Sequence, residues 1–174
     1  MKIKKALHFV WLTLRGLIFV CVAAILLANL YLTAAKSFFG QKNPTVFGFS
    51  TAVVLTGSMS GTIEPNDLIV TKKQDEYTVG DIIMFNTDTS SVTHRIIAEE
   101  EEGYRTKGDA NNTQDESSVK KESVVGKVVL VIPKIGAFVL FIRTPLGMLC
   151  FLALSALLLE LPSLVKYFME RKGT

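Results

Sequence analysis

Apolar residues concentrate at the two ends of the chain, whereas the middle alternates short apolar runs with polar turns. Near the N-terminus, residues 16–35 are almost wholly apolar, and Asn29 is the one strongly polar residue among them. About 20 apolar residues suffice for a helix that crosses a bilayer core of roughly 30 Å. A cleavable secretory signal is the alternative, but its apolar core is usually only about 7–15 residues long. The length of the run therefore favours an uncleaved transmembrane helix over residues 16–35.

The C-terminal part of the chain is apolar again. Residues 135–142 are apolar, Arg143 interrupts the pattern, and it continues over residues 145–159. We expect an interfacial segment over residues 135–143 and a transmembrane helix over residues 144–165. A core helix of a soluble protein is the alternative, but the polar middle offers no helices to receive it.

Basic residues flank both apolar segments on their outer sides. They are Lys2, Lys4, Lys5, Lys166, Arg171 and Lys172. Positive charge beside a membrane span tends to keep that flank in the cytoplasm. Residues 1–15 and 166–174 are therefore predicted to be cytoplasmic, and residues 36–134 extracytoplasmic.

The polar middle contains six short runs that suit β-strands. They cover residues 53–55, 68–71, 81–85, 92–98, 104–107 and 124–132. Turn signals such as Glu64-Pro65-Asn66-Asp67 separate them, and residues 99–102 suit a solvated hairpin tip. Short strands with this spacing predict an all-β sandwich or small barrel. The predicted fold is mainly β, with a small all-β extracytoplasmic domain flanked by N- and C-terminal transmembrane helices.

Charge and cysteine usage exclude some functions. Residues 36–134 carry 11 Lys and Arg against 14 Asp and Glu, whereas the two ends carry 8 against 2. The net charge of +3 therefore comes from the ends, and the middle has no basic face for nucleic acid. Cys21 and Cys150 both lie in the apolar ends, so the middle can form no disulfide. With two histidines in the chain, we expect neither a dedicated metal site nor a cofactor.

Three polar features together suit a serine hydrolase site. Ser58 lies between two β-branched runs, where flanking glycines let the backbone bend sharply. A serine nucleophile needs a base within reach and a group that orients the base. His94 is the histidine of the middle region and, by strand alternation, shares a face with Val92 and Ile96; the other histidine is on the cytoplasmic flank. Asp109 and Asp115 lie in one polar loop, and spacing does not decide between them. Each feature also has an ordinary explanation as a turn or a half-buried histidine.

Four motifs occur in one order along the middle region. They are Gly57-Ser58-Met59, Gly80-Asp81-Ile82-Ile83-Met84-Phe85, Thr93-His94-Arg95, and Thr106-Lys107-Gly108-Asp109 with Asn111, Asn112 and Asp115. This ordered set resembles the type I signal peptidases, and within them the ER-type (Ser-His) branch found in spore-forming Gram-positive bacteria and archaea. The similarity covers residues 53–115 and, more loosely, 126–133. The better-known bacterial branch has a lysine at the position of His94, and family members often have proline where this chain has Gly61.

The resemblance implies a membrane-bound serine endopeptidase that removes signal peptides from exported preproteins at the outer face of the cytoplasmic membrane. Ser58 would be the nucleophile and His94 the general base. This branch usually gives the third catalytic role to the later aspartate, so Asp115 is favoured and Asp109 is the alternative. The backbone N–H of Ser58 and the hydroxyl of Thr56 would form the oxyanion hole. Specificity for small residues at positions −1 and −3 of the substrate is implied as well.

Strand-like residues beside Ser58 could pair with an extended substrate by strand addition. The candidates are Ile82, Ile83, Met84 and Phe85. Met59 is expected to line the substrate cleft or touch lipid, with core packing as the alternative. The expected partners are exported preproteins and the lipid bilayer, and the sequence does not indicate an oligomeric state. The alternative function is a non-catalytic membrane-tethered β domain that assists surface-protein or pilus assembly.

Overall fold

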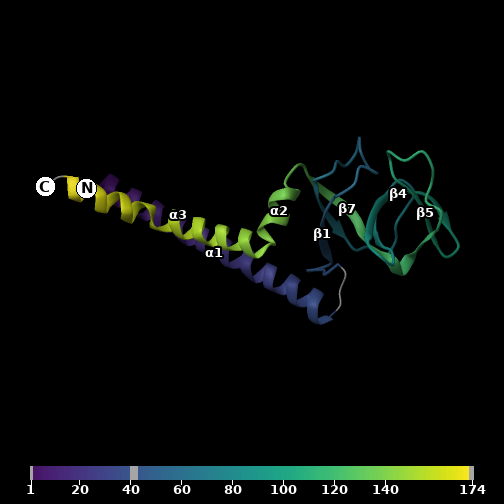
Figure 1. The fold of residues 1–174 in the computed structure, drawn as a ribbon, viewed down its shortest axis with the longest axis horizontal. Coiled ribbons are helices and arrows are strands. Elements are labelled where there is room, and N and C mark those ends of the chain that lie inside the picture. Colours follow the sequence, from purple (N-terminus) through teal and green to yellow (C-terminus); the bar gives the residue numbers. More distant parts are fainter. Residues whose placement is uncertain (1, 40–42, 173–174) are drawn as a thin grey trace. The chain divides into compact units, whose positions relative to one another are not determined.

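The computed structural model describes residues 2–39 and 43–172 of the 174-residue chain. The chain forms two compact units, one of residues 1–34 and 141–174 and the other of residues 35–140. Long helices make up the first unit and a β-sheet dominates the second (Figure 1). Met1, Gly173 and Thr174, which end the predicted cytoplasmic flanks, lie outside the described residues.

The helix α1 (Lys2–Phe39) contains the predicted N-terminal apolar segment. Within it, the 23 residues Phe9–Tyr31 are long and apolar enough to cross a membrane. The polar side chain of Asn29 is satisfied inside the helix, because its Nδ2 donates to the carbonyl of Ile25 at 3.0 Å. The predicted N-terminal apolar helix is therefore confirmed, in a helix that is longer than expected.

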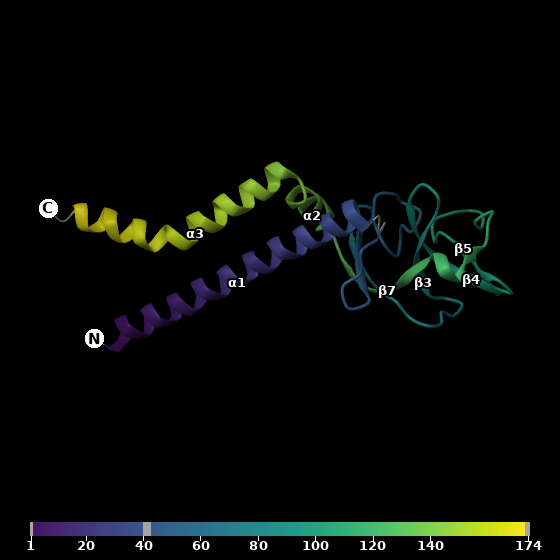
Figure 2. The same cartoon turned by 90° about the horizontal axis from the view of Figure 1, so that it is seen from below.

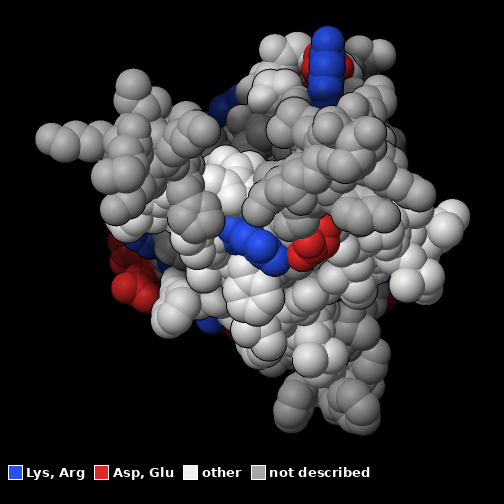
Figure 3. All heavy atoms as spheres, turned by 90° about the vertical axis from the view of Figure 1, so that its left-hand side faces the viewer, with Lys and Arg blue, Asp and Glu red and all other residues white. Residues whose placement is uncertain are grey.

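The helix α3 (Pro145–Lys172) supplies the C-terminal apolar segment. It meets the same criterion of length and hydropathy only together with the short helix α2 (Gly136–Ile142). Arg15 of α1 and Glu160 of α3 form an ion pair, with 2.9 Å between Nη2 and Oε1. On the side of the molecule that Figure 3 shows, most described surface atoms belong to uncharged residues. A membrane-spanning role for α3 stays a prediction.

The second unit is built on one antiparallel sheet. Its strands are β1 (Phe49–Val53), β2 (Leu68–Lys72), β3 (Ile82–Asn86), β4 (Ser91–Glu100), β5 (Gly103–Lys107), β6 (Val119–Lys120) and β7 (Val124–Ile132). Their order is β1-β2-β7-β3-β4-β5-β6, so β1 and β6 are the edge strands. Figure 2 shows β3 between β7 and β4, with β5 next. The mainly β prediction is confirmed, but among the described residues all seven strands belong to one sheet with two free edges, so neither the predicted sandwich nor a closed barrel is formed.

Five of the six predicted runs coincide closely with a strand. The predicted run 53–55 instead begins at the residue where β1 ends, because Ser50 and Thr51 interrupt the apolar pattern of the true strand. β6 has two residues, which is too short for any periodicity to reveal.

Side chains of β3 alternate between two hydrophobic clusters, because successive residues of a strand point to opposite faces. We call them the aromatic cluster and the methionine cluster. The aromatic cluster consists of Tyr77, Ile83, Phe85, Ile96, Tyr104, Val119 and Val124. The methionine cluster consists of Met59, Ile63, Ile69 and Met84. The segment that links β1 to β2 packs into the methionine cluster through Met59 and Ile63. This packing fixes the position of Ser58, which directly precedes Met59.

Candidate active site

Ser58 lies in a tight turn between β1 and β2. Backbone hydrogen bonds from Ser60 N to Gly57 O (3.0 Å) and from Ile63 N to Met59 O (2.9 Å) close this segment. Met59 is only 1% exposed and anchors the turn in the methionine cluster, whereas Ser58 is half-buried. The Ser58 hydroxyl is therefore carried by a well-packed turn at the edge of the core.

The polar loop that follows β5 lies directly against the backbone of Ser58. Ala110 N donates to Ser58 O at 2.9 Å, and Asp109 N donates to Met59 Sδ at 3.4 Å. A Cβ atom on Gly108 would lie 2.5 Å from Ser58 O, so this close approach requires glycine. Gly108 therefore lets the loop pack against the Ser58 turn.

The same loop holds His94 at its other end. Oδ2 of Asp115 accepts hydrogen bonds from His94 Nδ1 at 2.7 Å and from Thr106 Oγ1 at 2.6 Å. His94 is 7% exposed, and its ring meets that of Phe85 edge to face, with centroids 6.3 Å apart. An ionised carboxylate can only accept, so Nδ1 carries the proton and Nε2 is left as a base. The sequence motif contained Thr106, but only the fold reveals its contact with Asp115.

Arg95 and Asp109 form a second pair beside the first. Arg95 Nε and Nη2 donate to the two carboxylate oxygens of Asp109 at 2.8 and 2.6 Å, and Nη1 donates to Gly80 O at 2.8 Å. The hydrogen bonds from Arg95 lower the pKa of Asp109 against the opposing effect of burial, and Thr62 and the nearby His94 lower it further. Asp109 therefore has a different partner from the aspartate that holds His94.

Within the described chain, no hydrogen bond joins the side chains of Ser58 and His94. In the pairing of β3 with β4, Thr93 lies opposite Met84 of the methionine cluster, and His94 lies opposite Ile83 of the aromatic cluster. Thr93 therefore faces the side of the Ser58 turn, and His94 faces the other side. The loop 108–115 connects them, because it contacts the Ser58 backbone at one end and the His94 ring at the other.

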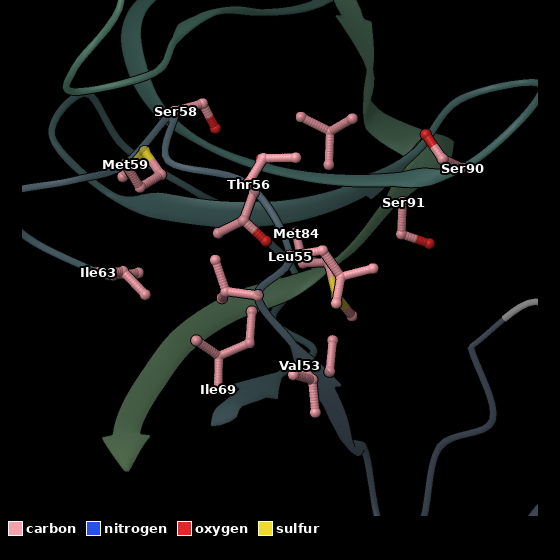
Figure 4. A pocket seen from close by; sticks show the side chains of 14 residues that line it. Val53, Leu55, Thr56, Ser58, Met59, Ile63, Ile69, Met84, Ser90 and Ser91 are labelled. Carbon is pink, nitrogen blue, oxygen red and sulfur yellow. The ribbon is translucent and has the colours of Figure 1, made fainter. Parts of the chain in front are cut away.

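A cleft of about 260 Å³ opens beside Ser58. Its lining residues are Ala52, Val53, Val54, Leu55, Thr56, Ser58, Met59, Ile63, Ile69, Met84, Ser90, Ser91, Val92 and Thr93. Figure 4 shows Ser58 and Thr56 on one side, Ser90 and Ser91 on the other, and Met84 between them. The methionine cluster thus forms an apolar floor, and residues 52–56 and 90–93 form two walls.

Both walls of this cleft have an unpaired backbone edge. β1 is an edge strand, and Leu55 just beyond it is 75% exposed. β4 pairs with β5 only from Arg95 onward, which leaves residues 91–94 without a strand partner on that side in the described chain. In contrast, Ile83 to Phe85 of β3 pair with β4 on one side and β7 on the other. Ile83 to Phe85 therefore have no free edge for strand addition in this structure, and substrate binding by residues 82–85 stays a prediction.

A second cavity of about 760 Å³ is lined by His94, Asp115 and Phe85, together with residues of the segment that leads to β6. It gives the His94–Asp115 pair its own opening, apart from the cleft lined by Ser58. Among the described residues, no group of three or more His, Cys, Asp and Glu side chains is placed to hold a metal ion.

Residues 31–129 match the family model described as Peptidase S24-like. The chain belongs to this family. All candidate residues from Thr56 to Asp115 lie inside the matched range of this Peptidase S24-like protein, whereas α3 lies outside it. Signal peptidase I W of Bacillus subtilis (strain 168) is 34% identical over 108 residues, which are 58% of this chain and 56% of the relative. The chain thus matches only about half the length of that relative.

These matches confirm the resemblance to type I signal peptidases that the order of the motifs predicted. A peptidase family together with a signal peptidase relative supports a serine peptidase, and the non-catalytic alternative is not favoured.

Proposed function

We propose that this Peptidase S24-like protein is a membrane-bound serine endopeptidase that removes signal peptides from exported preproteins at the outer face of the cytoplasmic membrane. The loop 108–115 carries the proposal, because it contacts the backbone of Ser58 and hydrogen-bonds the ring of His94. The loop therefore links the turn that carries Ser58 to the ring of His94. The similarity to a signal peptidase supports the choice of substrate.

In the proposed mechanism, Ser58 Oγ attacks the carbonyl carbon of the scissile peptide bond. His94 Nε2 takes the hydroxyl proton and then gives it to the leaving amine. Water attacks the resulting ester, its proton passes through His94 to Ser58 Oγ, and the free enzyme returns. Because Ser58 and His94 lie on opposite sides of β4 in this structure, the proposed mechanism requires a rearrangement on peptide binding that brings the two side chains within hydrogen-bond reach.

Asp115 and Asp109 have separate roles in this proposal. Asp115 accepts from His94 Nδ1 and so fixes the tautomer and stabilises the imidazolium that forms during the reaction. Asp109 is a positioning residue, which Arg95 holds and which fixes the loop against the Ser58 turn.

The oxyanion that develops on the substrate needs hydrogen-bond donors. The backbone N–H of Ser58 and the hydroxyl of Thr56 are the proposed donors, and both residues line the cleft. One such donor typically contributes about 2.7–4 kcal/mol to transition-state stabilisation.

An extended peptide fits the cleft between the unpaired edges of residues 52–56 and 91–93, where main-chain hydrogen bonds can form on either side. Alternate side chains of such a peptide point down to the apolar floor that Met59 and Met84 help to form.

The membrane arrangement is part of the proposal. Residues 16–35 and 144–165 cross the bilayer with both termini in the cytoplasm, residues 135–143 lie at the interface, and residues 36–134 form the outer catalytic domain. The Arg15–Glu160 ion pair supports an antiparallel pair of spans, because it joins the N-terminal part of α1 to the C-terminal half of α3. Anchoring the enzyme where signal peptides lie raises their effective concentration.

Cleavage of a preprotein by the full-length chain in detergent or liposomes tests the proposed function. We expect Ser58→Ala to remove cleavage, by roughly 10⁴-fold or more, and to leave the protein in the membrane fraction. Ser60→Ala is the matched control two residues away, since the Ser60 hydroxyl bonds Glu64 and does not line the cleft. Cleavage retained by Ser58→Ala would exclude Ser58 as the nucleophile.

A further inference from the structure

Residues 43–48, which precede β1, contact the cleft wall of residues 90–93 through the side chain of Asn43. Asn43 Nδ2 donates to Asn86 Oδ1 at 2.5 Å and to Ser91 Oγ at 2.8 Å. Ser91 Oγ in turn donates to Asn86 Oδ1 at 2.9 Å. The three polar side chains therefore form a closed ring of hydrogen bonds.

This ring of hydrogen bonds lies at the end of the β3–β4 hairpin, which carries the cleft wall of residues 90–93. Asn86 and Ser91 are the last paired residues of β3 and β4 before the turn between them. Ser90 and Ser91 line the cleft across from Ser58 (Figure 4). Because residues 91–94 have no strand partner on their outer side in the described chain, the hydrogen bonds of Asn43 add lateral support to this end of the hairpin.

The same segment is also tied to the strand that leads into the opposite wall. Ser50 Oγ of β1 donates to Pro44 O at 3.3 Å, and Ser50 is 4% exposed. Residues 43 and 44 therefore bridge the hairpin wall and β1. A bridge between two walls constrains the distance between them.

We propose that Asn43 is a positioning residue for substrate selection: it holds the Ser90–Ser91 wall at a fixed distance from residues 52–56 and so limits the side chains that the cleft admits. The inference rests on the proposed function, because the cleft is the proposed peptide site. The amide suits this role, since one nitrogen donates to two acceptors on the hairpin.

The substitution Asn43→Asp tests the proposal, because it keeps the side chain's shape and removes both donated hydrogen bonds. We would measure kcat and KM of the full-length protein in detergent on two preproteins that differ only in having alanine or valine before the scissile bond. We expect the ratio of kcat/KM for alanine over valine to fall about three- to tenfold, because a released wall admits the larger residue. For the alanine substrate, KM should rise more than kcat falls.

Two further variants make the test specific. Asn86→Ala removes the acceptor of the hydrogen bond from Asn43 and changes no residue that lines the cleft beside Ser58. It should shift the ratio in the same direction. Gln74→Glu adds the same charge at an exposed position that does not line the cleft, and it should leave the ratio unchanged.

An unchanged ratio in both Asn43→Asp and Asn86→Ala would overturn the inference, even if overall activity fell. A purely structural role would lower kcat/KM for the two substrates by the same factor. If the wild-type protein cleaves neither preprotein, the proposed function itself fails. If the wild type cleaves and the ratio does not move, only the role of Asn43 fails.

Discussion

His94 and Arg95 are consecutive residues that each hold an aspartate, yet the two pairs differ in construction. His94 meets Asp115 through one hydrogen bond of 2.7 Å, which leaves its second ring nitrogen available. Arg95 meets Asp109 through two hydrogen bonds, and a guanidinium is not deprotonated in proteins. The His94 pair can exchange a proton, whereas the Arg95 pair keeps the same charges throughout.

The difference separates two aspartates that lie in one loop. A carboxylate beside an imidazole stabilises a charge that appears only during the reaction. A carboxylate in a bidentate pair with arginine is compensated at all times and is suited to holding the loop 108–115 in place. In the proposed mechanism, Asp115 acts on the base and Asp109 acts on the position of the loop.

The largest expected difference between the pairs is in catalysis. Asp115→Asn should lower kcat for preprotein cleavage by about 10⁴-fold, because an amide favours the wrong tautomer of His94. Asp109→Asn should lower kcat by no more than about tenfold, since it disturbs only the placement of the loop. Preprotein cleavage assays in detergent would measure both values.

Thr106→Val sharpens this comparison, because it removes the second donor to Asp115 and leaves the aspartate in place. Its loss of kcat should lie between those of the two aspartate variants. A larger loss in Asp109→Asn than in Asp115→Asn would reverse the two assignments.

A smaller effect is expected at the oxyanion hole, on the Ser58 side of β4. Thr56→Val keeps the shape of the side chain and removes its hydroxyl, so kcat should fall by about 10²- to 10³-fold with little change in KM. Thr56→Ser keeps the hydroxyl and should retain most of the activity. A Thr56→Val variant with wild-type kcat would remove Thr56 from the oxyanion hole.

The Arg95 pair should appear in stability more than in catalysis. Asp109→Asn is expected to lower the free energy of unfolding by about 1.5–3 kcal/mol, the range for hydrogen bonds to charged groups. Thermal unfolding in detergent, followed by circular dichroism at neutral pH, measures this loss. Asp75→Asn is the control, since Asp75 is exposed, and it should unfold like the wild type.

The same pair predicts a pH dependence with a defined sign. The pKa of Asp109 is lowered in the folded protein, chiefly by the hydrogen bonds from Arg95, relative to about 3.9 in the unfolded chain. Its contribution to stability is therefore fully present above the unfolded pKa and is lost as the pH falls through the lower, folded value. The gap in unfolding temperature between wild type and Asp109→Asn should be constant from about pH 7 to 5 and close below about pH 4. A gap that persists undiminished at pH 3 would contradict this origin.

Local patterns were sufficient to predict much of the strand layout and the facing of His94. Period-two alternation placed His94 on one face with Val92 and Ile96, and the structure confirms this, because both pack in or against the aromatic cluster. The order of the strands was not predictable in this way. β7, from late in the chain, inserts between β2 and β3, and this long-range pairing is why residues 83–85 offer no unpaired edge.

The details of the candidate site depend on contacts between distant segments. Spacing could not distinguish Asp109 from Asp115, because the choice is made by Arg95 and His94 on another strand. The cleft arises from residues 52–56 and 90–93, and Asn43 reaches one of its walls from 48 positions earlier in the chain. Such contacts leave no periodic signal in a single sequence.

The central claim is that Ser58 and His94 act as one catalytic unit although no hydrogen bond joins them in the described structure. Its most direct test is kcat for cleavage of one preprotein by the wild type, Ser58→Ala, His94→Ala and the double variant. We predict that each single substitution lowers kcat by roughly 10⁴-fold or more and that the double variant is no slower than either single one. Losses that multiply in the double variant, or cleavage near the wild-type rate by Ser58→Ala, would contradict the account.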